Sequence, residues 1–256
     1  MAIVTLLTDS GESDHYIAAI KARMLAISPE IRIVDISHQI RLFDIGHAAF
    51  VLRSVFREFP KGTVHLVGVD AAGNRREGFI IVKLEGHFFV GADNGLFSLI
   101  SDQQAENIWE IREAGSELTT FPEKEVFAPV AAKLATGSDP NEIGKPSTEY
   151  KRLIDRQVKA TRKQITGHII RVDHFGNLIT NIPRQDFDVL SKGKSYTIQF
   201  GGEKFRRVHG AYNQAEQGEC FMVFNSQDFL EIGIYKGNAS ELLGLDYDSV
   251  VNIIFE

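Results

Sequence analysis

Two kinds of apolar pattern alternate at the start of the chain, and this alternation limits the possible folds most strongly. Residues 3–7 and 31–36 are continuous apolar runs rich in β-branched side chains, as in buried strands. Between them, apolar side chains recur at helical spacing, at Ile17, Ile20, Met24 and Ile27. Two strands joined through a helix are typical of a parallel pair, because a parallel connection must cross the sheet. The start of the chain therefore predicts a parallel sheet covered by helices.

The alternation continues along the first half of the chain, with one interruption. A helical pattern covers residues 44–59, and an apolar strand follows over residues 63–69. Residues 79–90 read as two strands around Glu85-Gly86, a dipeptide typical of a tight hairpin, so one antiparallel pair is expected. Helical spacing returns over residues 127–134.

The composition changes near the middle of the chain. Residues 151–163 hold six basic residues and one acid, and beyond them only short strand patterns follow. We interpret the charged segment as a solvated linker, although an anion-binding segment is the alternative. The predicted fold class is α/β: an N-terminal domain over residues 1–150 with a largely parallel sheet flanked by helices, a linker over residues 151–165, and a smaller C-terminal β-barrel-like domain over residues 166–256.

Charge and cysteine content restrict the class of partner. The chain has 28 basic and 34 acidic residues and a net charge of −6, which favours neither nucleic acid nor an anionic membrane. The expected partner is a small molecule, and a cation suits the charge. The one cysteine cannot form an internal disulfide, and no bilayer-spanning or signal-type segment is present, so we expect a cytoplasmic protein.

Carboxylates follow two of the predicted buried strands directly. Asp9 follows residues 3–7 and Asp70 follows residues 63–69. In an open parallel sheet, ligands bind beyond the carboxyl ends of the strands, so both carboxylates are expected at one crevice. A carboxylate has two acceptor oxygens, which suit the two vicinal hydroxyls of a ribose, so Asp9 is a candidate sugar-binding residue. Gly11 allows a close backbone turn there.

Structural explanations compete with each of these functional readings. Asp14 could cap the helix that carries Ile17 and Ile20, and Asp70 could open a turn. Asp173 and Asn177 stand at the two ends of a turn-forming segment that follows a predicted strand, and such segments are common in β proteins. Each signal is weak by itself.

Together, however, seven short motifs resemble a known family in their order along the chain. They are Thr8-Asp9-Ser10-Gly11 with Asp14, Val69-Asp70, Asn94-Gly95-Leu96, Phe127-Ala128-Pro129, Asp173-His174-Phe175-Gly176-Asn177, Thr180-Asn181-Ile182 and Asn225-Ser226. This series is similar to that of the S-adenosylmethionine (SAM) hydroxide adenosyltransferases, which are relatives of fluorinase and chlorinase. The resemblance covers nearly the whole chain.

The resemblance implies a role for each polar residue. Asp9 would hold the two ribose hydroxyls, and Asp14 and Asp173 would flank the ammonium group of the methionine part. Asn177 would contact the edge of the adenine. These side chains suit the groups they would meet, because carboxylates accept hydrogen bonds from hydroxyls and cations, and an amide both donates and accepts.

Aromatic and interface positions also follow from the resemblance. Phe43 and Tyr212 would pack around the nucleoside, and Ser226 would donate to the methionine carboxylate. A place in the hydrophobic core is the alternative for Phe43. Members of the family bind the ligand between the α/β domain of one subunit and the β domain of its neighbour, so a homotrimer is expected.

The implied reaction is hydrolysis of SAM to adenosine and methionine. Water or hydroxide attacks the ribose 5′ carbon opposite the sulfonium, and sulfur leaves as a neutral thioether. The leaving group needs no proton, so alignment and exclusion of competing water are the main requirements. No metal and no organic cofactor is expected. The alternatives are a halide-dependent 5′-halo-5′-deoxyadenosine synthase and a non-catalytic protein that binds SAM or adenosine.

The chain departs from the family around the nucleophile. Hydroxide-using members carry an aspartate, an arginine and a histidine there, and Asp70 with Arg75 or Arg76 would supply the first two. The loop after Asp70 is shorter than in the family. The position of the histidine is taken by Pro122, and the adjacent Glu123 offers a carboxylate instead.

Two other enzyme classes fit the sequence less well. The segment around Asp9 and Asp14 also resembles the aspartate-rich strand ends of calcium-dependent nucleoside hydrolases. Calcium takes six to eight oxygen ligands, more than these two carboxylates provide. A methyltransferase is disfavoured because no Gly-x-Gly loop follows the first strand.

Overall fold

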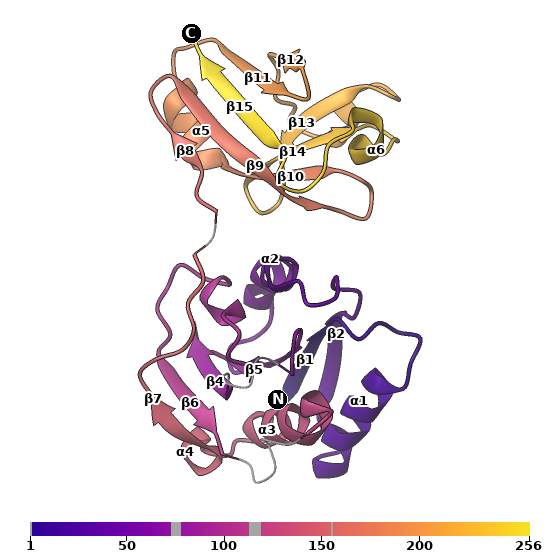
Figure 1. Ribbon diagram of the computed structural model, residues 1–256, viewed down its shortest axis with the longest axis vertical. Helices are drawn as coiled ribbons and strands as arrows, with labels where there is room; N and C mark the ends of the chain where they lie inside the picture. The colour runs from indigo at the N-terminus through magenta and orange to yellow at the C-terminus, as the bar shows by residue number, and fades with distance from the viewer. Residues whose placement is uncertain (1, 73–77, 113–118, 155) are drawn as a thin grey trace. The chain divides into compact units, whose positions relative to one another are not determined.

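The computed structural model describes residues 2–72, 78–112, 119–154 and 156–256 of the chain (Figure 1). The chain divides into two compact units, Met1–Ile154 and Asp155–Glu256. In the described residues, no helix is long and apolar enough to cross a membrane.

The N-terminal unit is built on a mixed sheet (Figure 1). Its strands lie in the order β2 (Arg32–Ser37), β1 (Ile3–Thr8), β3 (Val64–Gly68), β5 (His87–Ala92), β4 (Phe79–Leu84), β6 (Asn107–Ile111) and β7 (Gly144–Ser147). The first four strands of this order are parallel, and every later pairing is antiparallel. The parallel sheet and the antiparallel excursion that the sequence predicts are both confirmed.

The hairpin between β4 and β5 shows why the parallel pattern is interrupted. Glu85 and Gly86 have φ angles of 51° and 78°, the left-handed pair that a two-residue turn between twisted strands needs. Such a short turn reverses the chain, so β4 and β5 must run antiparallel.

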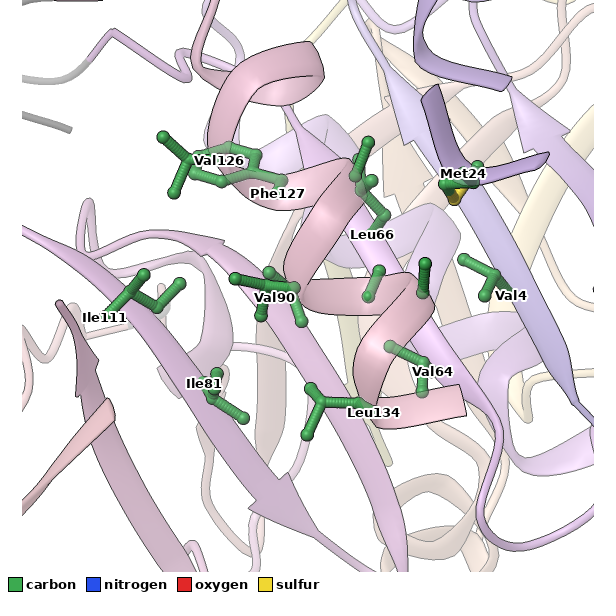
Figure 2. Packing of buried hydrophobic residues seen from close by; sticks show 14 of the residues in the cluster. Val4, Met24, Val64, Leu66, Ile81, Val90, Ile111, Val126, Phe127 and Leu134 are labelled. Atoms are coloured by element: carbon green, nitrogen blue, oxygen red, sulfur yellow. The ribbon is translucent and has the colours of Figure 1, made fainter. Parts of the chain in front are cut away.

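Helices lie on both faces of this sheet. One cluster of buried side chains joins the sheet to α1 (Tyr16–Ile27), the π-helix η4 (Glu123–Phe127) and α3 (Ala128–Ala135). Figure 2 shows Met24, Phe127 and Leu134 of these helices around Val64 and Leu66 of β3. Burying this apolar surface stabilises the unit by roughly 25 cal/mol per Å² removed from water.

The opposite face of the sheet packs on a different set of helices. They are α2 (Ile45–Val55), η1 (Phe56–Glu58) and η2 (Leu96–Ser98). The strands supply both faces because successive side chains point to opposite sides: Leu6 of β1 joins the first cluster and Leu7 the second. The short α4 (Pro140–Ile143) precedes β7.

A buried polar chain crosses three neighbouring strands near the starts of β3 and β5. Thr5 Oγ1 lies 2.7 Å from His65 Nδ1, and His65 Nε2 lies 3.2 Å from His87 Nδ1. Burial, with a smaller effect of His87, lowers the pKa of His65 to about 3. The His65 ring is therefore neutral at physiological pH, and the strands are joined there without a buried charge.

The C-terminal unit is a curled, entirely antiparallel sheet that forms a half-barrel. Its strands lie in the order β12 (Glu203–Phe205), β11 (Tyr196–Phe200), β15 (Val250–Phe255), β9 (Gln164–Val172), β10 (Leu178–Pro183), β14 (Phe229–Ile234) and β13 (Cys220–Phe224), and β8 (Lys159–Ala160) pairs with β9. Short helices α5 (Arg184–Ser191), η5 (Tyr212–Gln214) and α6 (Ala239–Leu243) connect them. The predicted barrel-like β region is confirmed.

Candidate functional site

The carboxylate of Asp9 joins three segments that are far apart in the sequence. Asp9 follows β1, and its Oδ2 accepts hydrogen bonds from the backbone N–H groups of Phe43, at 2.9 Å, and Asp70, at 3.2 Å. Phe43 lies in the segment between β2 and α2, and Asp70 follows β3. Among the described residues, Oδ1 of Asp9 accepts no hydrogen bond. Oδ2 therefore binds the backbone at the edge of the sheet, so Oδ1 alone, and not both oxygens as the sequence suggests, is left for a ligand.

Both donors to Asp9 have a strained backbone. Phe43 has a φ angle of 62° and Asp70 one of 46°, in the left-handed region that costs a residue with a Cβ roughly 1–3 kcal/mol. An aspartate tolerates this region better than a bulky side chain does. The Phe43 side chain is 69% exposed, so the core role considered for it is wrong. Strain of this kind persists where the surrounding structure enforces it.

Asn94, two residues after the end of β5, stabilises the same edge. Its buried amide donates to the backbone oxygen of Val69 at 2.9 Å, and its Oδ1 accepts from the N–H of Leu96 at 3.2 Å. Gly11, with a φ angle of 68°, donates its N–H to the backbone oxygen of His38 at 2.9 Å. Asn94 and Gly11 thus fix the backbone on either side of Asp9 and Asp70.

Glu123 places a second carboxyl group over this edge. It is the first residue of η4, and its side chain lies on Gly68, the last residue of β3. A Cβ atom on Gly68 would stand 2.7 Å from Cγ of Glu123, so only glycine leaves the space that this side chain occupies. Burial raises the pKa of Glu123, and the nearby Asp9 carboxylate adds to the effect.

The remaining predicted residues of this unit are placed differently. Asp14 is exposed in the segment before α1, whose N-cap residue is His15 without a capping side chain. Asp14 therefore does not cap α1, and the structural alternative for it is wrong. Arg75 and Arg76 lie outside the residues that the structure describes.

A pocket of about 680 Å³ opens in the C-terminal unit, and three of the predicted residues line it. Asp173, Asn177 and Tyr212 share its wall with Phe175, Phe221 and residues 234–238. Oδ1 of Asp173 accepts from the N–H groups of Phe175 at 2.9 Å and Asn177 at 2.8 Å. Asp173 thus forms the turn that the sequence pattern suggests and also faces the pocket.

The shape of this pocket depends on a glycine behind it. A Cβ atom on Gly233 would stand 2.1 Å from Cζ of Phe221 and 2.5 Å from Oδ1 of Asn177. Tyr212 packs edge-on against Phe221, with ring centroids 5.3 Å apart. Gly233 therefore lets an aromatic ring and an amide sit directly on β14.

Glu231 is a residue of this region that the sequence analysis did not single out. It is 3% exposed, and its Oε2 accepts from the Asn225 amide at 3.1 Å. Burial raises the pKa of Glu231, and desolvation together with the Glu231 carboxylate raises the pKa of Tyr212 to about 12. A signal was present, because Glu231 is the only charged residue in the apolar run of β14.

Ser226 is not among the residues that line the pocket. It is exposed in the loop after β13, where its Oγ accepts from the Gln227 side chain at 3.2 Å. Within the described residues, no group of three or more His, Cys, Asp or Glu side chains could hold a metal ion.

Comparison with known proteins places both units in one family. The N-terminal domain of the SAM hydroxide adenosyltransferases matches residues 4–144, and the C-terminal domain of the same family matches residues 167–252. The chain belongs to the SAM hydroxide adenosyltransferase family. The resemblance seen in the sequence motifs is therefore confirmed.

Two relatives named as hydrolases are similar over almost their whole length. The chain is 32% identical to an (R)-S-adenosyl-L-methionine hydrolase of Methanocaldococcus jannaschii, covering 99% of this chain and 96% of the relative. It is 29% identical to a hydrolase of the same name from Thermus thermophilus. A fluorinase of an Actinoplanes species is more distant, at 27% identity over 75% of each chain. A crystal structure of an uncharacterized protein from Thermotoga maritima superposes with a TM-score of 0.87 at 30% identity, covering 98% of this chain and 99% of the other.

The raised pKa of Glu231 predicts a specific pH dependence of stability. An acid whose pKa is higher in the folded state contributes stability that is complete below its unfolded pKa, about 4.3, and is lost as the pH rises through the folded value. We therefore expect Glu231→Gln to gain stability relative to the wild type between pH 4.5 and pH 8, by at most about 1.4 kcal/mol per pH unit. Urea unfolding followed by circular dichroism measures this difference.

The exposed Glu241 of α6 provides the matched control. Glu241→Gln should differ from the wild type by the same amount at both pH values. A constant difference between Glu231→Gln and the wild type over this range would show that Glu231 titrates normally.

Proposed function

We propose that the chain hydrolyses S-adenosyl-L-methionine to adenosine and L-methionine, by in-line attack of water or hydroxide on the ribose 5′ carbon. The observation that carries this proposal is that both domains of the family match the chain, in order. In addition, each unit has a carboxylate at its candidate site, Asp9 in the N-terminal unit and Asp173 in the C-terminal unit. Relatives named as hydrolases cover almost the whole chain, whereas the fluorinase covers three quarters of it. Hydrolysis is therefore favoured over halogenation.

The chemistry of the substrate suits such a site. The sulfonium and the ammonium of SAM are cationic, and carboxylates stabilise cations close to them. The C5′–S bond breaks with both electrons going to sulfur, which becomes a neutral thioether, so the leaving group needs no acid. Catalysis then consists largely of holding the nucleophile in line with the C5′–S axis, an effect that supplies on the order of 7 kcal/mol or more in well-oriented model reactions.

The proposed roles divide between the two units. In the N-terminal unit, Oδ1 of Asp9 would accept hydrogen bonds from the two ribose hydroxyls. Phe43 would pack on the nucleoside. Asp14 would contact the methionine ammonium, and Asp70 would orient the attacking water with Arg75 or Arg76. The backbone of Phe43 and Asp70 is already held by Asp9, which supports placing them in one site.

The proposed roles in the C-terminal unit concern adenine and methionine. Asn177 would form hydrogen bonds with the edge of the adenine, and Tyr212 would pack on the nucleoside. Asp173 would contact the ammonium group of the methionine part. Their common pocket supports this assignment for the three residues. Ser226 would donate to the methionine carboxylate. We further propose a homotrimer from the family resemblance and a cytoplasmic location from the single cysteine. Because the thioether leaves without a proton, we propose that the reaction needs no metal or organic cofactor.

Identification of the products tests the proposed function. The protein is incubated with SAM in ¹⁸O-labelled water, with and without chloride, and the nucleosides are identified by mass spectrometry. Both sulfonium epimers are compared, because the relatives' name specifies the (R) form. We expect ¹⁸O-labelled adenosine and methionine. Formation of 5′-chloroadenosine would instead identify a halogenase, and methylthioadenosine or free adenine would contradict attack at the 5′ carbon.

Substitution of Asp9 tests the ribose assignment. Asp9→Asn keeps one oxygen for the N–H groups of Phe43 and Asp70 but removes the charge, so we expect SAM to bind about ten- to a hundredfold more weakly. Asp9→Ala should abolish detectable binding in isothermal calorimetry. Glu12→Gln, an exposed change in the same segment, is the control and should bind normally. Unchanged affinity of Asp9→Ala would remove Asp9 from the site.

A further inference from the structure

Glu123 is a carboxyl group held in place by the fold at the edge of the sheet where Asp9 and Asp70 lie. It begins η4, and η4 packs against β3, β5 and α1. The side chain lies over Gly68, which would place Oε1 3.5 Å from a Cβ atom at that position. Gly68 also pairs with the end of β1, because its oxygen accepts the N–H of Asp9 at 3.2 Å. Glu123 is thus packed onto the strand ends that carry the proposed site.

Among the residues that the structure describes, no cation holds Glu123 in an ion pair. In the described part of the chain, no lysine, arginine or histidine forms a salt bridge with it, and the charged group that influences it is Asp9. The carboxylate accepts a hydrogen bond from its own backbone N–H.

In the described part of the elements packed on η4, no titratable side chain forms an ion pair with Glu123. Asp9 follows β1, and its negative charge contributes to the raised pKa of Glu123. On α1, Tyr16 is directed edge-on at Phe121, and Lys21 pairs with Asp35 of β2 at 2.6 Å. Within the residues that the structure describes, the largely buried Glu123 carboxyl group therefore has no ion-pair partner, and Arg75 and Arg76 lie outside those residues.

We propose that Glu123 accepts the proton released by the attacking water. This role rests on the hydrolysis proposed above and assigns the base of that reaction. The water oxygen forms a bond to the ribose 5′ carbon, and the C5′–S bond breaks with its electron pair going to sulfur. One proton of the water passes to the Glu123 carboxylate, and adenosine keeps the other on its new 5′ hydroxyl. The proton on Glu123 returns to solvent when the products leave.

The electrostatics of the site suit this role. A general base works best when its pKa lies near the pH at which the enzyme operates. Desolvation, with a smaller contribution from Asp9, raises the pKa of Glu123 above the ordinary value of a glutamate. Glu123 is therefore a stronger base than an exposed carboxylate, and the carboxylate form needed for catalysis is lost as the pH falls through that raised pKa.

The test compares two glutamates of the same π-helix. Glu123→Gln keeps the shape and the hydrogen-bonding capacity of the side chain but cannot take a proton. Glu125→Gln is the matched control, because Glu125 is exposed and contacts the Thr119 hydroxyl. Glu123→Asp keeps the carboxylate on a shorter side chain. For each protein, adenosine formation from SAM is measured between pH 5 and pH 9, SAM affinity by calorimetry, and folding by circular dichroism.

We expect Glu123→Gln to lower kcat by about a hundredfold or more, in the range typical of a lost general base, with SAM affinity unchanged. The decline in rate of the wild type toward acidic pH should disappear in this variant. Glu123→Asp should recover part of the rate together with the acidic decline, and Glu125→Gln should match the wild type.

Three outcomes would overturn the assignment, and they are distinguishable. If the wild type forms adenosine and a folded Glu123→Gln keeps its rate and its acidic decline, Glu123 is not the base. Loss of rate in Glu123→Gln without partial recovery in Glu123→Asp and without any change of the pH profile would show a structural role. If the wild type itself forms no adenosine from either sulfonium epimer, the proposed function fails first, and the role of Glu123 fails with it.

Discussion

The carboxylate of Asp9 is the interaction on which the proposed site in the N-terminal unit depends. Three segments meet on it: the end of β1, the end of β3 at Asp70, and the loop before α2 at Phe43. Both partners have left-handed backbone, which costs roughly 1–3 kcal/mol for each residue. Two charge-assisted hydrogen bonds, each worth about 1.5–3 kcal/mol, are enough to offset that cost. A single side chain therefore holds two neighbours of the proposed ligand in otherwise unfavourable conformations.

Much of this arrangement could be predicted from the sequence, because it follows from short-range patterns. The apolar runs predict β1 and β3, and Asp9 and Asp70 then fall at the carboxyl ends of adjacent parallel strands. The hydrogen bonds from Phe43 and Asp70 to Asp9 could not be predicted, because they join residues 34 and 61 positions away in the chain. Local patterns carry no information about such contacts.

The C-terminal unit shows the same limit. The apolar pattern does not predict a strand over residues 178–183, where β10 lies, because Asn181 and Pro183 interrupt it. The side chain of Asn181 forms two hydrogen bonds. Its Oδ1 accepts from the N–H of His168 at 2.8 Å, and its Nδ2 donates to the backbone oxygen of Arg156. The sequence does not single out Glu231, although it is the only charged residue among the apolar residues of β14. Its raised pKa and its contacts depend on Asn225 and Tyr212, which lie beside it only in the folded unit. The predicted linker over residues 151–165 stays a prediction.

Asp9 is central to the proposed site: Oδ1 would bind the ribose hydroxyls, and Oδ2 accepts hydrogen bonds from the backbone N–H groups of Phe43 and Asp70. A crystal structure of the protein with adenosine and methionine tests it most directly. We predict both ribose hydroxyls within hydrogen-bond distance of Oδ1 of Asp9, about 2.5–3.0 Å, with the bonds from Phe43 and Asp70 to Oδ2 retained. A ribose bound elsewhere, or bound here with its hydroxyls turned away from Asp9, would contradict the account.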